Sequence, residues 1–308
     1  MKTKPKLPVK PMLRIFLNWV EERQRVHLRR ESGEPPPWTD NPILRKYRFC
    51  STYREDDRVT KWIREHWREP YKDHPNLWFA MCIARQINWP DSLEAIGFPE
   101  TWEPRKVLKI LNQRMKAGKK TFTSAYLLGG GNNTGLSKTE YVINHVLNPV
   151  WKSFKYEGGF CFKESGNGAI GLMSYQATLQ QTWEWLIQFH GWGKFLAYET
   201  VTDLRHTRYL CNAPDINTWA NAGPGAQRGL NRLYRRELNQ SHPQSQLLEE
   251  LLLLNTWVIE NRDIKLLPAW EARDTEHQLC ETDKMLRVKE REAAGKVSGL
   301  ERFHAGLL

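Results

Sequence analysis

The chain has 308 residues, with 46 Lys and Arg against 35 Asp and Glu, which gives a formal net charge of +11. This length allows one large domain or two ordinary ones, and the positive charge favours a polyanionic partner such as nucleic acid. No apolar run of membrane-spanning length, no signal-peptide core and no CxxC pair among five scattered cysteines are present, which excludes a membrane-spanning protein, a disulfide framework and a zinc ribbon.

The first half of the chain is predicted to be helical after a loose basic tail at residues 1–12. Apolar residues at helical spacing run over about 11–30. Three successive prolines then force extended geometry within 33–42. The helices that follow are predicted at 55–69, 74–88, 91–96, 103–117 and 138–156. Ser137 or Thr139 is expected to be the N-cap of the last one.

The second half is also predicted to be helical, at 174–190, 194–206, 225–240, 243–262 and 273–293. Only 121–128 and 160–164 alternate with period two, so they are weak strand candidates. The glycine-rich run 158–171 is the expected mobile loop or domain boundary. We therefore predict a mainly α fold.

A glycine-rich loop, 128-LGGGNNTGLSKTEY-141, has the GxxxxG spacing of a phosphate-binding P-loop. In a P-loop the lysine follows the second glycine directly, whereas here Leu136 and Ser137 separate Gly135 from Lys138. The helical surroundings also lack a βαβ setting, so we do not predict a nucleotide site. Free N–H groups at the start of a helix still indicate an anion site, to which we assign Asn132, Asn133, Ser137 and Lys138.

A glycine turn joins two predicted helices at 190-HGWG-193. This is the layout of a helix–hairpin–helix, in which backbone N–H groups of the turn approach a DNA phosphate. A plain αα-hairpin has the same pattern and stays open as the alternative. The candidate DNA-binding residues here are Gly191, Trp192, Gly193 and Lys194.

A second glycine turn, 223-GPGAQRGLNRLYRR-236, opens a helix that carries a row of arginines. A helix N-terminus with such a row suits contacts with phosphate, so Gly225, Arg228 and Arg232 are further candidate DNA-binding residues. A solvated basic face is the alternative.

The segment 273-RDTEHQLCETDKMLRVKER-291 is predicted as a helix with one chemically mixed face. At 100° per residue, an arc of about 140° holds two carboxylates, an imidazole, a thiol and two cations: Glu276, His277, Cys280, Glu281, Lys284 and Arg287. This mixture suits proton transfer beside an anionic substrate, and a solvated salt-bridge face is the alternative. His277 and Cys280 lack a second Cys/His pair, so no metal is expected.

Four separated motifs carry a resemblance to one phage family. They are 30-RESGEPPPWTDNPILRKYRFCSTYREDDRVTKWI-63, then Gly191-x-Gly193-x-Phe195-x-Ala197-Tyr198 with Asp203-Leu204, then Gly223-Pro224-Gly225 with Arg228-Gly229-Leu230, and Glu276-His277-x-x-Cys280-Glu281-x-Asp283-Lys284. Over roughly residues 25–290 they resemble the α-glutamyl/putrescinyl thymine pyrophosphorylases (amino acid:DNA transferases), which are related to the helical part of 5-hydroxymethyluracil DNA kinases.

The resemblance implies a DNA-glycosylase-like helical fold with a helix–hairpin–helix motif. It implies an enzyme that acts on phosphorylated 5-hydroxymethyluracil in double-stranded DNA and replaces phosphate or pyrophosphate with an amine. The product is then an N-substituted aminomethyluracil, for example 5-Nα-glycinylthymidine. Glycine is the first choice of amine because many bulky aromatic residues leave little room, while putrescine and glutamate stay open. No cofactor is expected.

The resemblance also suggests roles for residues around the flipped base. Side chains available to stack on it are Trp38, Phe49 and Tyr53. Thr39 is a further candidate residue of the pocket that binds the flipped base. Candidate cations that stabilise the departing phosphate are Arg54, Arg58, Lys138, Lys284 and Arg287. The glycine-rich loop is then expected to grip phosphate on DNA or on the activated base.

The incoming amine is protonated at neutral pH and must lose a proton before it attacks. The candidate proton acceptors are Asp203, Glu276 and His277, of which Asp203 is favoured by analogy with glycosylases, and Glu281 completes the predicted catalytic group. The ammonium of the amine would be bound by Asp40, Asp57 and Glu281. The carboxylate of an amino acid would be bound by an arginine such as Arg54.

Three other readings stay open: a helix–hairpin–helix DNA glycosylase, the hydroxymethyluracil DNA kinase itself, and a non-catalytic DNA-binding protein. The expected partners are double-stranded DNA with the modified base and a small amine or amino acid, with no membrane. We expect a monomer in the cytoplasm of the infected bacterial host.

The motifs divide the chain into four predicted parts. These are a basic tail (1–12), an N-terminal helical part with the substrate-pocket motif and the glycine-rich loop (13–157), a helix–hairpin–helix part (158–240) and C-terminal helices that complete the active site (241–308).

Overall fold

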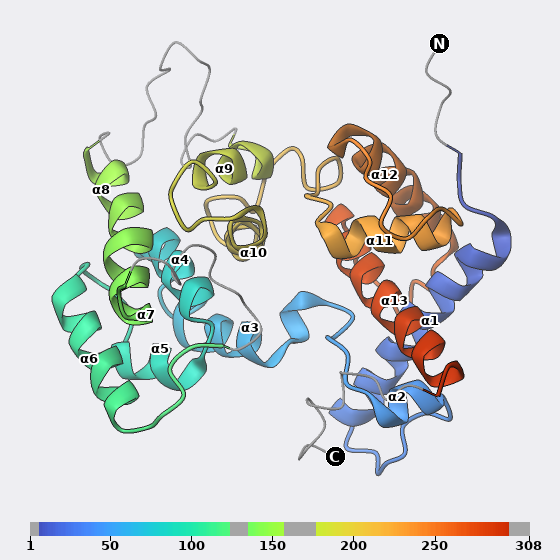
Figure 1. The fold of residues 1–308 in the computed structure, drawn as a ribbon, viewed down its shortest axis with the longest axis horizontal. Helices are drawn as coiled ribbons and strands as arrows, with labels where there is room; N and C mark the ends of the chain where they lie inside the picture. The colour runs from blue at the N-terminus through green and yellow to red at the C-terminus, as the bar shows by residue number, and fades with distance from the viewer. Residues whose placement is uncertain (1–5, 124–134, 157–176, 296–308) are drawn as a thin grey trace. The chain divides into compact units, whose positions relative to one another are not determined.

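Helices dominate the structure, a computed structural model that describes residues 6–123, 135–156 and 177–295 (Figure 1). The mainly α fold is therefore confirmed. These three ranges contain no strand, so the strand expected from residue 121 is wrong over its described part, 121–123. The other candidate, 160–164, and the run 158–171 lie outside the described residues. Within the described part of the chain, no helix combines the length and apolar character needed to cross a membrane.

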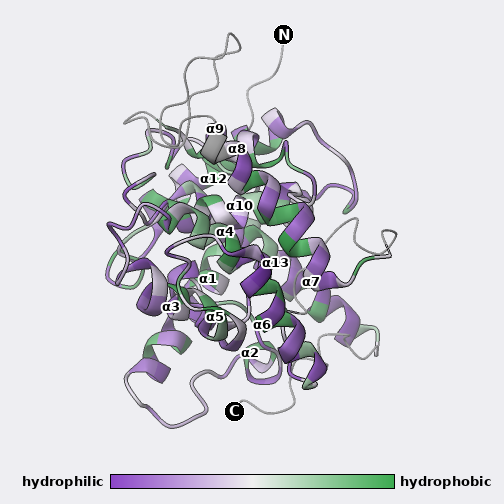
Figure 2. Ribbon diagram, turned by 90° about the vertical axis from the view of Figure 1, so that its left-hand side faces the viewer, coloured by the Kyte–Doolittle hydropathy of each residue, from purple (hydrophilic) through white to green (hydrophobic). Residues whose placement is uncertain are grey.

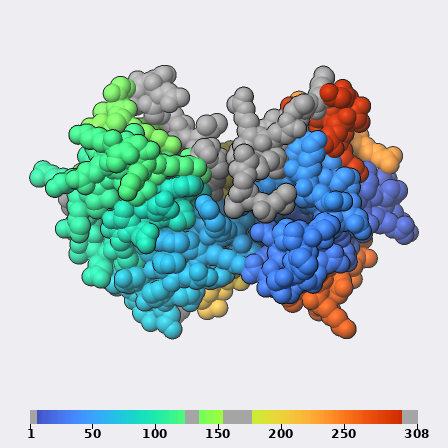
Figure 3. Space-filling model, turned by 90° about the horizontal axis from the view of Figure 1, so that it is seen from below, coloured from blue at the N-terminus to red at the C-terminus, as the bar shows by residue number. Residues whose placement is uncertain are grey.

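The chain forms two compact units. The first unit combines both ends of the chain, Met1–Asp57 and Asn217–Leu308, and the second is the continuous middle, Arg58–Ile216. Figures 1 and 3 show blue N-terminal and red C-terminal segments together within the first unit. The four-part division of the sequence stays a prediction.

The described helices of the first unit come from both ends of the chain. They are α1 (Lys10–Glu31), α2 (Pro42–Lys46), the 3-10 turn η1 (Arg54–Asp56), α11 (Pro224–Leu233), α12 (Gln244–Asn261) and α13 (Ala272–Ala293). Helix α2 is missing from the sequence prediction because it is only five residues long. Its N-cap Asn41 accepts a hydrogen bond from the backbone N–H of Ile43 at 3.0 Å. Ile43 is buried in a core cluster with Trp19 and Met285, which explains why this short helix is held.

Helices α11 and α13 approach closely because two glycines of α11 face α13. A Cβ atom on Gly225 would lie 2.7 Å from Sγ of Cys280, and one on Gly229 would collide with the backbone oxygen of Leu279. Such distances leave no room for a larger side chain. The glycines of this second motif, Gly225 and Gly229, therefore allow α11 to pack closely on α13.

The described helices of the second unit follow one another along the chain. They are α3 (Arg58–Ile63), the π-helical η2 (Arg64–Arg68), α4 (Leu77–Ile87), α5 (Pro90–Ile96), α6 (Pro104–Lys116), α7 (Lys138–Glu140), the π-helical η4 (Tyr141–Leu147), α8 (Asn148–Tyr156), α9 (Leu179–Leu186) and α10 (Lys194–Leu204). The expected N-cap Ser137 is confirmed, and it forms a capping box with Glu140.

Helix α4 forms the centre of the second unit and is buried along its whole length. Helix α10 packs on α4, and α9 packs on α10. By contrast, α6 buries only Val107 and Leu111. Figure 2 shows this difference as a green α4 and a mostly purple α6. A helix that is apolar over most of its surface belongs in a core, whereas an amphipathic one covers it.

Candidate active site

In the first unit, buried hydrogen bonds fasten the segment after α2 to helix α13. Arg23 of α1 donates to the backbone oxygens of Cys50 and Ser51, the latter at 3.2 Å. It also donates to Oε1 of Gln278, whose Nε2 donates to the backbone oxygen of Thr52 at 2.7 Å. Because Arg23 and Gln278 are both buried, this network fixes the segment against one face of α13.

The mixed face predicted for the C-terminal helix lies where α13 meets this segment. Glu281 Oε2 accepts a hydrogen bond from the backbone N–H of Cys50 at 3.0 Å and lies 3.6 Å from Nζ of Lys284. His277 Nε2 lies 3.2 Å from the backbone oxygen of Ser51. A carbonyl oxygen only accepts, so Nε2 carries the hydrogen of this bond. Glu281 is buried and the other two side chains are half-buried, so the face is packed against protein.

Burial and charge set the protonation of this face. Burial lowers the pKa of His277 below its ordinary value despite the neighbouring carboxylates, so the imidazole is neutral at pH 7. Burial alone would raise the pKa of Glu281, but Lys284 and Arg23 outweigh it and hold that pKa below its ordinary value. Burial raises the pKa of Cys280, which therefore keeps its proton. The face thus combines a fixed carboxylate with a neutral imidazole.

Two further members of the predicted face differ in their surroundings. Glu276 is buried, and its Oε1 lies 3.7 Å from Sγ of Cys280. Arg287, one turn beyond Lys284, is exposed. Only the first part of the face is therefore enclosed.

Phe49 stands beside the charged face. Its ring packs edge-on against Trp19 with the ring centroids 4.8 Å apart, and Nζ of Lys284 lies 4.7 Å from the centroid of the Phe49 ring. An aromatic surface and a cation are therefore adjacent. Tyr53, also predicted to stack, instead donates its hydroxyl to the backbone oxygen of Ala269 at 2.8 Å.

The remaining predicted site residues of the first unit differ in their contacts and exposure. Arg54 pairs with Asp57, with Nη1 and Oδ2 3.6 Å apart. Trp38 donates its indole N–H to the backbone oxygen of Glu34 at 2.7 Å. The buried Thr39 donates its hydroxyl to Glu22 at 2.5 Å, and Asp40 is exposed.

One group of side chains in this unit has the donor atoms to hold a metal ion. The donor atoms of Cys50, Asp57 and His277 all lie within 4.8 Å of one another. The sequence prediction of no metal considered His277 only with Cys280, whereas folding brings it beside two side chains more than two hundred residues away in the chain.

Asp203, the favoured proton acceptor, lies in the second unit, in a buried ion pair. Its Oδ1 accepts from Nη2 of Arg85 at 2.6 Å, and its Oδ2 accepts from Nε of the same guanidinium. Both side chains are 1% exposed. Arg85 also donates to Thr60 at 2.9 Å and to Asn88 at 3.2 Å. Asp203 and the face of α13 therefore belong to different units, and its catalytic role stays a prediction.

The glycine turn between α9 and α10 has one residue in the left-handed region. Gly191 has φ +79°, and a Cβ atom there would collide with the Val146 side chain, so only glycine fits. Trp192 is buried and donates its indole N–H to the Val146 backbone oxygen at 3.0 Å. Gly193 is the N-cap of α10, and it and Lys194 are exposed. The surface that the turn offers to a partner is therefore Gly193 and Lys194.

The two arginines predicted on α11 engage carboxylates of α13. Arg228 Nε lies 2.9 Å from Oδ2 of the buried Asp283, and Arg232 Nε lies 2.8 Å from its Oδ1. Arg232 Nη2 also donates to Glu290 at 3.0 Å. These guanidinium groups hold the two helices together in addition to any contact with DNA.

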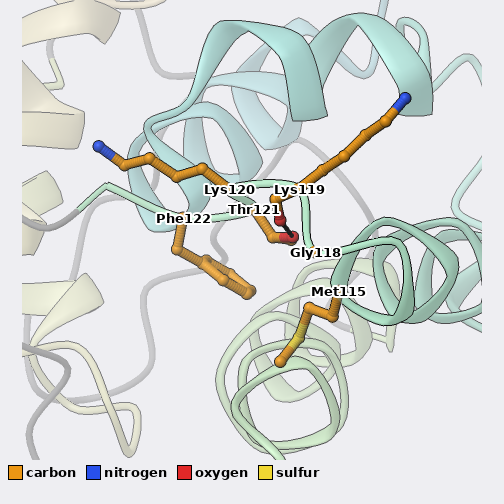
Figure 4. A pocket seen from close by; sticks show the side chains of 6 residues that line it. All are labelled: Met115, Gly118, Lys119, Lys120, Thr121 and Phe122. Atoms are coloured by element: carbon orange, nitrogen blue, oxygen red, sulfur yellow. Dashed lines mark hydrogen bonds between the residues drawn. The ribbon is translucent and has the colours of Figure 1, made fainter.

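Cations and aromatic rings meet on the surface of the second unit. The side chain of Lys138 lies over the Phe122 ring, with Nζ 4.6 Å from the centroid, and Nζ of Lys120 lies 3.9 Å from the Trp89 ring centroid. Arg58 lies over the same Trp89 ring at 5.9 Å. A hollow of about 370 Å³ adjoins them, lined by Met115, Gly118, Lys119, Lys120, Thr121 and Phe122 (Figure 4). Asn132 and Asn133 of the predicted anion site lie outside the described residues.

Sequence reasoning missed Arg23, Gln278 and Arg85, although two of them left a signal. Arg85 is a lone arginine within the apolar run 77-LWFAMCIARQI-87, which indicates a buried acidic partner. Arg23 continues the apolar stripe of α1 one turn after Val20. A charged residue on a core-facing stripe generally has a specific partner.

Three comparisons with known proteins bear on this site. Residues 10–295 match the family described as 5-hmdU DNA kinase, helical domain. The chain is 27% identical over 247 residues to a 5-hmdU DNA kinase of Bacillus phage SP10. That alignment covers 74% of this chain and 37% of the relative, so the chain spans little more than a third of that protein's length. No solved structure matches the chain.

Proposed function

Because the chain belongs to the family of the 5-hmdU DNA kinase helical domain, we propose that it is a phage DNA-modifying enzyme that acts on 5-hydroxymethyluracil in double-stranded DNA. In finer terms, it displaces phosphate or pyrophosphate from the activated 5-hydroxymethyl group with an amine. An amino acid such as glycine is the first candidate. The reaction takes place in the infected bacterial cell, and the chain acts as a monomer.

The observation that carries this proposal is the pairing of Phe49 with Lys284 beside Glu281. An aromatic ring suits stacking with a flipped pyrimidine, and an adjacent ammonium suits the negative charge that leaves from the exocyclic carbon. Glu281 is held ionised by its contacts, so it can bind the ammonium of the incoming amine. The carboxylate of Glu281 and the ammonium of Lys284 lie 3.6 Å apart. One negative and one positive side chain therefore suit a displacement in which both reactants are charged.

The reaction balances with groups on this face. A carbon–nitrogen bond forms and the carbon–oxygen bond to phosphate breaks, so the bonding electron pair leaves with the phosphate. The proton of the ammonium passes to a carboxylate or imidazole, for which Glu276 and His277 are the candidates in this unit. Displacement is direct or passes through an exocyclic methylene intermediate.

Asp203 remains a candidate proton acceptor in the proposal, but its geometry favours positioning. Both of its oxygens accept from Arg85, so neither accepts a proton from an amine without breaking that ion pair.

DNA binding is proposed for the exposed positive residues of the second unit. Gly193 and Lys194 present a helix N-terminus with an adjacent cation, as a helix–hairpin–helix of a glycosylase-like fold would. Lys120 and Lys138 lie over aromatic rings, which holds their side chains at the surface. Phosphate contacts of this kind position DNA without reading its sequence.

The test is mass spectrometry of nucleosides after incubation with DNA that carries 5-phosphomethyl- or pyrophosphomethyl-uracil and a mixture of amines. A thymidine adduct would identify both the reaction and the amine. Lys284→Met is expected to lower product formation by about 100-fold or more, as for loss of one charge-stabilising group. Lys289→Met, an exposed lysine on the same helix, is the matched control and should keep full activity.

The same incubation, together with a second one that contains ATP and hydroxymethyluracil DNA, separates the other readings. Release of free base indicates a glycosylase, and phosphate transfer from ATP to hydroxymethyluracil DNA indicates a kinase. DNA binding without any product, with every amine and both activated bases, would refute the proposed reaction.

A further inference from the structure

Three side chains of the first unit bring metal-ligating atoms together from two distant parts of the chain. Sγ of Cys50, a carboxylate oxygen of Asp57 and a ring nitrogen of His277 all lie within 4.8 Å of one another. We propose that these residues bind a divalent transition-metal ion of the zinc class. The inference goes beyond the proposed reaction and does not depend on it.

The spacing of the three donor atoms fits one ion. In a triangle whose sides do not exceed 4.8 Å, a central point lies within about 2.8 Å of all three corners (4.8 Å divided by √3). Zinc binds sulfur at about 2.3 Å and imidazole nitrogen or carboxylate oxygen at about 2.0–2.2 Å. Side-chain movements below about 1 Å therefore complete the coordination. Three protein ligands leave a fourth tetrahedral position open, as in catalytic zinc sites.

Hydrogen bonds already hold the side chains of His277 and Asp57 and the backbone of Cys50. The backbone of Ser51 serves two of them: its oxygen accepts from His277 Nε2 at 3.2 Å, and its N–H donates to Oδ1 of Asp57 at 2.9 Å. The backbone N–H of Cys50 donates to Glu281 at 3.0 Å. Metal sites use such outer contacts to fix the ring orientation of histidine and the direction of carboxylates. Because Nε2 of His277 carries a hydrogen, Nδ1 keeps the electron pair that a metal needs.

The mixture of donors selects the class of ion. Sulfur and imidazole nitrogen favour zinc and its neighbours, whereas magnesium and calcium prefer oxygen ligands throughout. Two cations, Arg54 beside Asp57 and Lys284 beside Glu281, offset the negative charge of the site. In the absence of a metal, Glu281 and burial raise the pKa of Cys50 above its ordinary value, so the ion must displace the thiol proton when it binds.

If His277 binds a metal ion through its free electron pair, the same pair cannot accept a proton from the amine. With the metal in place, Glu276 is the remaining proton acceptor on this face of the first unit. Metal binding can be measured without DNA or amine, so failure of the site and failure of the proposed reaction are distinguishable.

The test uses the full chain, freed of metal by a chelator and titrated with Co²⁺ alone. We expect one equivalent to bind and to give a thiolate-to-cobalt charge-transfer band in the near ultraviolet. Cys50→Ser should abolish the band and weaken binding by about 100-fold or more. Two cysteine variants are matched controls that should keep the band: Cys211→Ser, at an exposed site in the second unit, and Cys280→Ser, on the same face of α13.

A second measurement guards against misfolding of a variant. Asp57→Asn keeps the shape of the side chain and should weaken Co²⁺ binding while the circular dichroism spectrum is unchanged. Zn²⁺ should also slow alkylation of Cys50, located by peptide mass spectrometry, and leave Cys211 reactive. No stoichiometric Co²⁺ binding by the wild-type chain, or a band that survives Cys50→Ser, would overturn the proposal.

Discussion

Replacing Asp203 with alanine removes the carboxylate that faces Arg85 in the core of the second unit. Both side chains are 1% exposed, so the guanidinium would stay buried without the carboxylate that now faces it. Its hydrogen bonds to Thr60 and Asn88 satisfy donors but supply no negative charge. Breaking a buried ion pair in this way costs about 3–5 kcal/mol. For a domain of this size, that loss lowers Tm by about 6–20 °C.

Thermal unfolding followed by circular dichroism measures the loss, and amide hydrogen exchange in α4 and α10 shows whether it lies in the second unit. The double variant Arg85→Met/Asp203→Leu removes both charges and should regain most of the stability. Lys106→Ala is the control, because its pair with Glu103 is exposed and should change the free energy of unfolding by no more than about 0.5 kcal/mol.

One outcome tests the buried ion pair, and two others decide the role of Asp203. A loss below about 1 kcal/mol for Asp203→Ala would refute the buried ion pair as described. If the double variant is stable and still forms product, then Asp203 has a positioning role. A stable double variant with no product would support Asp203 as the proton acceptor and move the reaction away from the face of α13.

Three further variants test other parts of the structure. Gly229→Ala should destabilise the first unit by about 1–3 kcal/mol in urea unfolding, because the new Cβ meets the backbone oxygen of Leu279; a neutral result would contradict the close packing. Lys120→Ala should weaken DNA binding equally for all sequences and reduce the salt slope by about 0.9, and an unchanged slope would remove Lys120 from the DNA surface. Phe49→Ala should weaken binding of DNA with the modified base by about 1–3 kcal/mol, and equal weakening for unmodified DNA would exclude stacking on the base.

Helical periodicity predicted the long helices of this chain well, because an amphipathic stripe depends only on nearby residues. The helix expected at 11–30 is α1, and the one expected at 103–117 is α6. The same method failed for α2, whose five residues are too few to show a period. It also missed the π-helical turns within 138–156, since their wider hydrogen bonding leaves no mark in the apolar pattern.

The mixed face of α13 was predictable for the same reason, since Glu276, His277 and Glu281 share one helix. What it meets was not predictable, because Cys50 and Asp57 are brought there by tertiary packing. Spacing along one helix therefore paired His277 only with Cys280, whereas the fold adds Cys50 and Asp57 as neighbours. Only the fold shows which distant thiol and carboxylate stand beside that imidazole.

The glycine and arginine motif at 223–236 and the mixed face of α13 were predicted as separate motifs, but they belong to one structural assembly. The glycines and arginines at 223–236 were assigned to DNA, yet Gly225 and Gly229 let α11 lie against α13, and Arg228 binds Asp283 on it. Helix α13 carries the catalytic candidates on the adjoining face. A rigid helix pair keeps those side chains at fixed distances, which proton transfer and charge stabilisation both require. The arginine motif is thus explained by what it holds in place, whether or not it also contacts a phosphate.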